Sequence, residues 1–417
     1  MKLDIVVRLS ITLVLSLSTA ASSQTFSVIH NFTGEAGGAI PYAGVLIGHD
    51  GNLYGTTAAG GRGTCSSDDF GAGCGTVYEL NPSNESFTTL WQFAGGASDG
   101  ATPEAALVIG PGGAMYGSTF AGGVQYCPGG CGIMFRLTPP VSVPRTIKEN
   151  QWSEKIVYSF QGLDGQNPSG TMETDASGNI YGATAEGGAQ SSGTVFKLSY
   201  VNGAWTESKL HEFSAYVDGD FPEGGVTLDA AGNIYGTTYT GFGAGDVWQL
   251  IASSNWALNI LYSFGIQTGE NPTSGVTLDS SGNVYGSTSG GGPDRGGTVF
   301  ELSSGDWSFH LLHSFSAGAG PLLSNLIFDK AGNLYGTTYS DGSVRNGSYG
   351  TVFKLAPSNG TWTYSLIHEF TGGSDGAYPV GTLVFDANGN LYGTTSQGGD
   401  LSKCGGKGCG VVFKITL

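Results

Sequence analysis

The chain has 417 residues, of which 73 are Gly, 39% are hydrophobic and only 12% are Asp, Glu, Lys or Arg. This composition excludes a disordered chain, and the scarcity of charged helix formers excludes helical bundles and coiled coils. The net charge of −17 disfavours binding to nucleic acid and to anionic lipid. We therefore expect a folded, nearly all-β protein.

Residues 1–23 have the pattern of a secretory signal peptide. Lys2 and Arg8 make a short basic segment, residues 9–17 form an apolar run that is too short to span a bilayer, and small residues follow it. We therefore predict a secreted protein, extracellular or periplasmic, without a membrane span.

A short motif recurs seven times along the rest of the chain. It consists of an aliphatic residue or Met, then Tyr and Gly, usually preceded by Gly-Asn, and its copies are 50 to 65 residues apart. This period suits one four-stranded blade of a β-propeller and is too long for a β-helix coil or a leucine-rich repeat. The seven Tyr residues are Tyr54, Tyr116, Tyr181, Tyr235, Tyr285, Tyr335 and Tyr392.

The fourth repeat shows the four expected strands most clearly. They are residues 225–229, 233–238, 246–250 and 256–264, and a crossover rich in Asp, Gly and Pro starts each following blade. The first turn, 229–232, begins with Asp and ends with Gly, as tight turns require. Equivalent Asp residues should therefore cap turns rather than carry function, and they are Asp175, Asp229, Asp279, Asp329 and Asp386.

Aromatic residues in the second, third and fourth strands make both faces of each sheet apolar, which favours a closed ring of stacked blades. The Gly after each motif Tyr is expected where a neighbouring blade comes close. Residues 25–32 match a fourth strand, whereas the last repeat ends after its third strand, 411–415. We therefore predict that residues 24–417 form a single, monomeric, seven-bladed β-propeller of four-stranded antiparallel blades, with the N-terminal strand closing the last blade. An exposed insertion is expected at Pro139 to Asn150.

The motif resembles a known repeat family. The pattern Asp-x-x-Gly-Asn-(Leu/Ile/Val)-Tyr-Gly-x-Thr, then Gly-Gly and Gly-Thr-Val-Phe-Lys-Leu, resembles the Gloeo/Verruco-type (GloVer) tandem repeat of secreted bacterial proteins over nearly all of the mature chain. That resemblance implies a secreted repeat protein, often with a C-terminal surface anchor, which this sequence lacks, and with no established activity. The first two strands of each repeat are also similar to streptogramin-lyase-like propeller repeats.

Acidic residues concentrate in the crossovers and in the loops between second and third strands, which share one end of a propeller, here called the top face. Sixteen acidic and five basic residues fall there. Four of the acids lie four residues before a crossover Pro, namely Asp99, Asp164, Asp218 and Asp375. They either bind Ca²⁺ or a cationic or hydroxyl-rich ligand, or cap their own loops. Glu104 and Glu223, beside the crossover Pro and near the central channel, are the acids without repeats.

Histidine chemistry has no candidate on this face. His30, His211, His313 and His368 occupy a packing position two residues before the last Phe of a fourth strand. We therefore predict a binding or surface-interaction module for a carbohydrate or cell-surface ligand, either a glycan or a ligand bridged by a cation; no cofactor is established, and Ca²⁺ is the candidate. The alternative is a carboxylate-dependent hydrolase or lyase that cleaves polysaccharide.

Six Cys residues fall in three pairs, each within one loop of the top face. Local disulfides are expected in an exported protein, and zinc is the rival interpretation, weakened because these loops contain no His. The expected pairs are Cys65–Cys74, Cys127–Cys131 and Cys404–Cys409.

Overall fold

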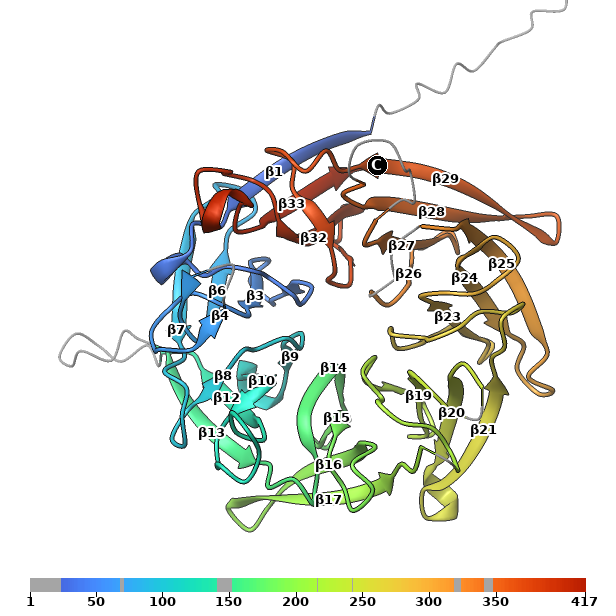
Figure 1. Ribbon diagram of the computed structural model, residues 1–417, viewed down its shortest axis with the longest axis horizontal. Helices are drawn as coiled ribbons and strands as arrows, with labels where there is room; N and C mark the ends of the chain where they lie inside the picture. Colours follow the sequence, from blue (N-terminus) through green and yellow to red (C-terminus); the bar gives the residue numbers. More distant parts are fainter. Residues whose placement is uncertain are drawn as a thin grey trace, which may run out of the picture.

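The computed structural model is a ring of seven antiparallel blades around a central axis (Figure 1). It describes residues 24–67, 71–140, 152–215, 217–241, 243–318, 324–340 and 348–417. The proposed signal peptide and nearly all of the predicted insertion lie outside these ranges. Within them, no helix has the length and apolar character needed to cross a membrane.

Each blade contains four strands, which in blades 1 to 6 follow one another in sequence order from the central axis to the outer rim. Blade 1 contains β2 (Leu46–Ile47), β3 (Leu53–Thr57), β6 (Thr76–Leu80) and β7 (Phe87–Gln92); blade 2 contains β9 (Val108–Ile109), β10 (Met115–Thr119), β12 (Ile133–Thr138) and β13 (Ser153–Ser159). Blade 3 contains β14 (Gln166–Thr174), β15 (Ile180–Glu186), β16 (Thr194–Val201) and β17 (Ala204–Glu212); blade 4 contains β18 (Thr227–Leu228), β19 (Ile234–Thr238), β20 (Asp246–Ile251) and β21 (Ala257–Ser263). Blade 5 contains β22 (Thr277–Leu278), β23 (Val284–Thr288), β24 (Arg295–Leu302) and β25 (Phe309–Ser316); blade 6 contains β26 (Ile327–Phe328), β27 (Leu334–Thr338), β28 (Thr351–Ser358) and β29 (Thr361–Glu369).

Blade 7 joins the two ends of the chain. It contains β31 (Val384–Phe385), β32 (Asn390–Gln397) and β33 (Val411–Thr416), and its outer strand is β1 (Thr25–Asn31), which pairs antiparallel with β33 (Figure 1). The predicted closure by the N-terminal strand is confirmed. Short strands in the top loops complete the fold: β4 (Ser66–Ser67), β5 (Gly71–Ala72), β8 (Gly100–Ala101), β11 (Ala121–Gly122) and β30 (Ala377–Pro379).

The hydrophobic core is divided into seven clusters, one at each seam between neighbouring blades. At the seam between blades 5 and 6, for example, Tyr285 of blade 5 belongs to one cluster with Leu334 and Phe353 of blade 6. Both faces of every sheet are thus buried, as the aromatic pattern predicts.

The Gly after each motif Tyr makes room for a ring within its own blade. Gly286 pairs directly with Phe300 on the third strand, and a Cβ built on Gly286 would lie 2.6 Å from Cζ of that ring. The corresponding distance is 2.4–2.7 Å in all seven blades. The expectation that a neighbouring blade approaches this Gly is therefore wrong: the cross-strand aromatic partner fills the space.

The crossovers that enter the channel are fixed by residues with left-handed backbone conformation. The N–H of Thr102 donates to the carbonyl of Cys74 at 2.9 Å, and the carbonyl of Thr102 accepts from the N–H of Phe120 at 2.9 Å, so this residue ties blade 1 to blade 2. Non-glycine residues are strained here, and opposing hydrogen bonds hold them in place. Six described crossovers have such a residue immediately before the Pro, with φ of 52–58°: Ile40, Thr102, Asn167, Phe221, Asn271 and Tyr378.

All three predicted disulfides are present, Cys65–Cys74, Cys127–Cys131 and Cys404–Cys409, each inside one top loop. They lie in blades 1, 2 and 7, and each loop also accepts a crossover N–H, at the carbonyl of Cys74, Cys131 or Cys409. One sector of the top face is therefore cross-linked both covalently and by hydrogen bonds.

Candidate ligand-binding site

The Asp residues at the first turns of the blades are structural wherever they occur. In blade 4, Asp229 accepts the N–H groups of Ala231 and Asn233 with one oxygen, and the Asn233 amide and the Tyr235 hydroxyl with the other, at 2.8–3.2 Å. The same arrangement recurs around Asp175, Asp279, Asp329 and Asp386. This explains why Asp, Asn and Tyr recur together in the motif.

Each of the four crossover Asp residues caps the end of the outer strand of its own blade. Asp218 accepts the N–H of Ser214 at 2.7 Å and meets Nε2 of His211 at 2.9 Å, and Asp164 accepts the hydroxyl of Tyr158 at 2.5 Å. The other loop amides bound by this set are those of Ala94 to Asp99, Gln161 to Asp164 and Thr371 to Asp375, at 2.7–2.9 Å. The geometry favours the capping interpretation for all four residues.

Nothing in the described ranges brings three or more His, Cys, Asp or Glu side chains into one metal-binding group. The four crossover Asp residues belong to four different blades and each has partners in its own loop. A shared Ca²⁺ site formed by these Asp residues therefore gains no geometric support, and Ca²⁺ binding stays a prediction.

Three of the four histidines before the last Phe of a fourth strand, His30, His313 and His368, stack on the outer strand of the next blade. His30 lies 4.0 Å from the ring of Phe87, and His368 lies 3.8 Å from that of Phe26, both nearly parallel. Burial lowers the pKa of His30 to about 4, so this ring is neutral at neutral pH. The packing role predicted for these histidines agrees with the stacking.

Blades 2 and 3 carry a carboxyl group where other blades place a ring or an aliphatic side chain in this stack. Glu154 and Glu207 occupy the position held by Phe87, and Oε1 of each is buried with no hydrogen-bond partner in the described part of the chain. Burial, and then the nearby charge of Asp99 or Asp164, raises the pKa of each Glu to about 7. Sequence reasoning missed this pair, although an alignment of the seven fourth strands shows the substitution.

A cleft of about 490 Å³ opens at the rim between blades 2 and 3. Tyr126 and Leu163 are 75% and 73% exposed on its walls, which is unusual for such large side chains in a folded protein. Lys209 donates to the carbonyl of Leu163 at 3.1 Å and pairs with Glu212. The lining residues are Tyr126, Gln161, Leu163, Asp164, Glu207 and Lys209.

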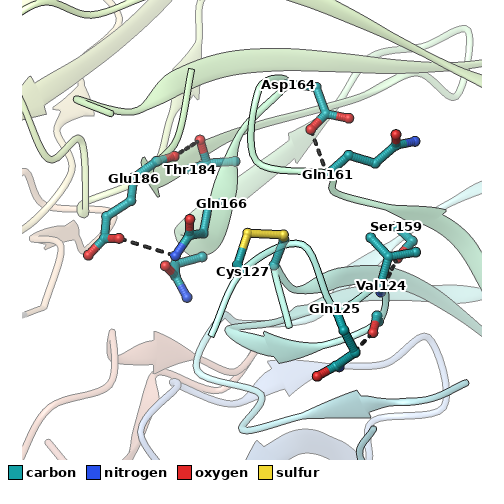
Figure 2. The surroundings of a disulfide bond; sticks show 12 residues. Val124, Gln125, Cys127, Ser159, Gln161, Asp164, Gln166, Thr184 and Glu186 are labelled. Carbon is teal, nitrogen blue, oxygen red and sulfur yellow. Dashed lines mark hydrogen bonds between the residues drawn. A yellow bond between two sulfur atoms is a disulfide. The ribbon is translucent and has the colours of Figure 1, made fainter. Parts of the chain in front are cut away.

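One wall of this cleft is held by the disulfide loop of blade 2. Tyr126 precedes Cys127, whose disulfide with Cys131 fixes the loop, and the sulfur of Cys127 lies against Gly162 of the crossover. Figure 2 shows this disulfide near the hydrogen bond between Gln161 and Asp164. The disulfide and the Asp cap thus preform the side of the cleft that presents the aromatic group.

The other two predicted site residues, Glu104 and Glu223, lie at the central channel. Both line one cavity of about 60 Å³, to which every blade contributes through its crossover. Burial and then the charge of Glu223 raise the pKa of Glu104 to about 7, and burial and then Glu186 raise that of Glu223. The structure therefore brings these two acids together and separates them from the crossover Asp residues.

Comparisons with known proteins identify the repeat. The model of the Gloeobacter/Verrucomicrobia repeat matches residues 14–154, 130–349 and 242–417. No curated protein matches the chain. Similar solved structures include a fungal alcohol oxidase in complex with copper (15% identity, 92% of this chain and 75% of that chain, TM-score 0.53) and a candidate 6-phosphogluconolactonase from Bacteroides uniformis (15% identity, 85% and 90%, TM-score 0.51). At such identities these likenesses show the fold alone.

Proposed function

The chain belongs to the Gloeobacter/Verrucomicrobia repeat family, and we propose that it is an exported binding module that holds a glycan in the cleft between blades 2 and 3. Export is supported by the signal-peptide pattern and by three disulfides, which persist in oxidising compartments. The structure adds a cleft at the rim, whose lining includes Asp164, one of the acids predicted on the top face.

The observation that supports a glycan is the composition of the cleft. An exposed aromatic ring, Tyr126, and an exposed aliphatic side chain, Leu163, offer apolar contact, while Gln161, Asp164 and Glu207 offer hydrogen-bonding groups. Sugar rings combine apolar C–H faces with hydroxyl groups, so a wall of this mixed character suits them. The cleft volume is also in the range of small-molecule sites.

A glycan array followed by calorimetric titration of the best ligand tests this proposal. Tyr126→Ala should weaken binding about tenfold or more, because loss of a buried aromatic contact of 1.4 kcal/mol has that effect. Tyr200→Ala is the matched control, since Tyr200 is 61% exposed at the far end of blade 3 and should leave affinity unchanged. Equal affinities of the two variants, or the lack of any glycan ligand, would refute the site.

One observation favours the enzymatic alternative at the same cleft. Burial and then the charge of Asp164 raise the pKa of Glu207 to about 7, so this side chain can remain protonated near neutral pH, whereas Asp164 accepts two hydrogen bonds. Two carboxyl groups in such different environments are what glycosidic cleavage uses. Release of reducing ends from the bound glycan, abolished in Glu207→Gln with binding retained, would establish an enzyme.

A further inference from the structure

Another large cavity lies on the face opposite the top loops, at the seam between blades 6 and 7. It measures about 770 Å³ and is formed by the first turns of both blades, 328–331 and 385–389, together with Tyr335, Lys354 and Leu417. Its volume is in the range of small-molecule sites. It shares no residue with the cleft between blades 2 and 3, so a ligand here is independent of the glycan proposed above.

Two phenylalanine residues contribute apolar walls to this cavity, and both depart from the repeat. Phe328 and Phe385 end the first strands of blades 6 and 7, and each pairs with the Leu before the motif Tyr. The ring of Phe385 meets that of Tyr335 edge-on, at 5.1 Å between centroids. The same position is aliphatic or Thr in the other blades: Ile47, Ile109, Thr174, Leu228 and Leu278. This seam therefore presents Phe from both of its blades.

Two lysines supply positive charge to the same cavity. Lys354 is half-buried opposite Tyr335, with Nζ 5.6 Å from the ring centroid, and Lys330 is exposed on the first turn of blade 6. Among the residues that the structure describes, neither ammonium group has an ion-pair partner. The equivalent residues in blades 4 and 5 are uncharged or acidic: Gln249 and Glu301 for Lys354, and Ala230 and Ser280 for Lys330.

The two carboxylates in the lining are engaged within their own turns. Asp329 accepts the N–H groups of Ala331 and Asn333, the Asn333 amide and the Tyr335 hydroxyl, at 2.7–3.2 Å. Asp386 accepts the four equivalent bonds of the blade 7 turn, also at 2.7–3.2 Å. Because these donors hold and stabilise both carboxylates, the lysines gain no contact with them. In a chain with a net charge of −17, this cavity thus offers two unpaired cations beside aromatic rings.

We propose that the cavity binds a small aromatic carboxylate, with its ring against Phe328 and Phe385 and its carboxylate at the ammonium groups of Lys330 and Lys354. Edge-on or offset ring contacts and charge-assisted hydrogen bonds would hold such a ligand. A neutral aromatic compound would leave both ammonium groups unpaired, and an aliphatic acid would lose the ring contacts. The combination of lining residues therefore selects this class of ligand.

Titration calorimetry of the mature protein with 2-naphthoate tests the proposal, and we expect one site per chain. The neutral analogue 2-naphthamide and the aliphatic acid cyclohexanecarboxylate should each bind about fivefold or more weakly, which corresponds to about 1 kcal/mol. Lys354→Gln and Phe385→Leu should each weaken naphthoate binding by a similar factor. These variants introduce the residues that blade 4 carries at the same positions, Gln249 and Leu228, so they should fold.

Lys197→Gln is the matched control. Lys197 occupies the position of Lys354 in blade 3, with Nζ 5.4 Å from the ring of Tyr181, but does not line the cavity, so this variant should keep the parent affinity. Equal affinities of Lys354→Gln and Lys197→Gln would overturn the proposal. So would the absence of binding by the parent at about 10 mM naphthoate, or binding of either analogue as tight as that of naphthoate. Tyr126→Ala, which alters only the glycan cleft, should bind naphthoate like the parent.

Discussion

A single methyl group on Gly286 should destabilise the propeller. The new Cβ would lie 2.6 Å from Cζ of Phe300, about 1 Å inside ordinary carbon–carbon contact. Phe300 has no exposed surface, and its ring meets Phe264 of the preceding blade at 5.0 Å between centroids, so it cannot move without displacing that blade. We expect Gly286→Ala to lower the free energy of unfolding by about 1–3 kcal/mol, the usual cost of an overpacked core.

Urea denaturation followed by Trp fluorescence measures this loss, with disulfides kept intact and the m value compared between variants. Gly265→Ala is the control, because Gly265 has open space around its Cβ position and no positive φ. Its stability should change by less than about 0.5 kcal/mol. In the Phe300→Leu background the smaller side chain should make Gly286→Ala nearly neutral. If Gly286→Ala matches Gly265→Ala in the parent, the steric account is wrong.

Three further changes test other parts of the molecule. Deletion of residues 25–32 bares the edge of β33, so the variant should aggregate or melt far below the parent in a thermal scan; an unchanged Tm would contradict the closure. Thr102→Gly should raise the free energy of unfolding in urea by about 1 kcal/mol by removing a left-handed Thr, and Thr102→Ala should not; equal values would argue against strain. The raised pKa of Glu154 lets the folded state bind more protons than the unfolded state between pH 4.5 and about 7, so stability falls as pH rises through that window. Glu154→Gln should therefore stabilise the protein by about 1 kcal/mol at pH 8, after allowance for solvent screening, and not at pH 4; a pH-independent effect would count against this account.

The blades and their closure were predictable because the chain repeats the same motif of strands and turns seven times. The motif around Tyr235 marks the second strand, its spacing gives the blade, and residues 25–32 have the pattern of a fourth strand with no other place to pair. The error at the glycine arose because the repeat shows that Gly and an aromatic residue recur but not which residues pair. The antiparallel register that sets Gly286 opposite Phe300 supplies this information.

The candidate sites were less predictable because they depend on departures from the repeat. Glu207 sits where other blades have a ring, so it is visible only when corresponding strands are aligned. The cleft beside it depends on how far Tyr126 projects from its loop, which no sequence pattern gives. The left-handed conformation of Thr102 was also hidden, since a residue before Pro is normally read as extended.

The pairing of β1 with β33 also governs the order in which the protein can fold. If the chain is exported from its N-terminus, β1 emerges first. It then has no pairing partner until β33, the third strand of blade 7, has also emerged. Six blades can form from neighbouring segments, but the seventh requires closing a loop as long as the whole chain, which is entropically costly and slow. A chain shortened by only a dozen residues at its C-terminus would therefore have an open ring with two unpaired edges, even if the other six blades were intact.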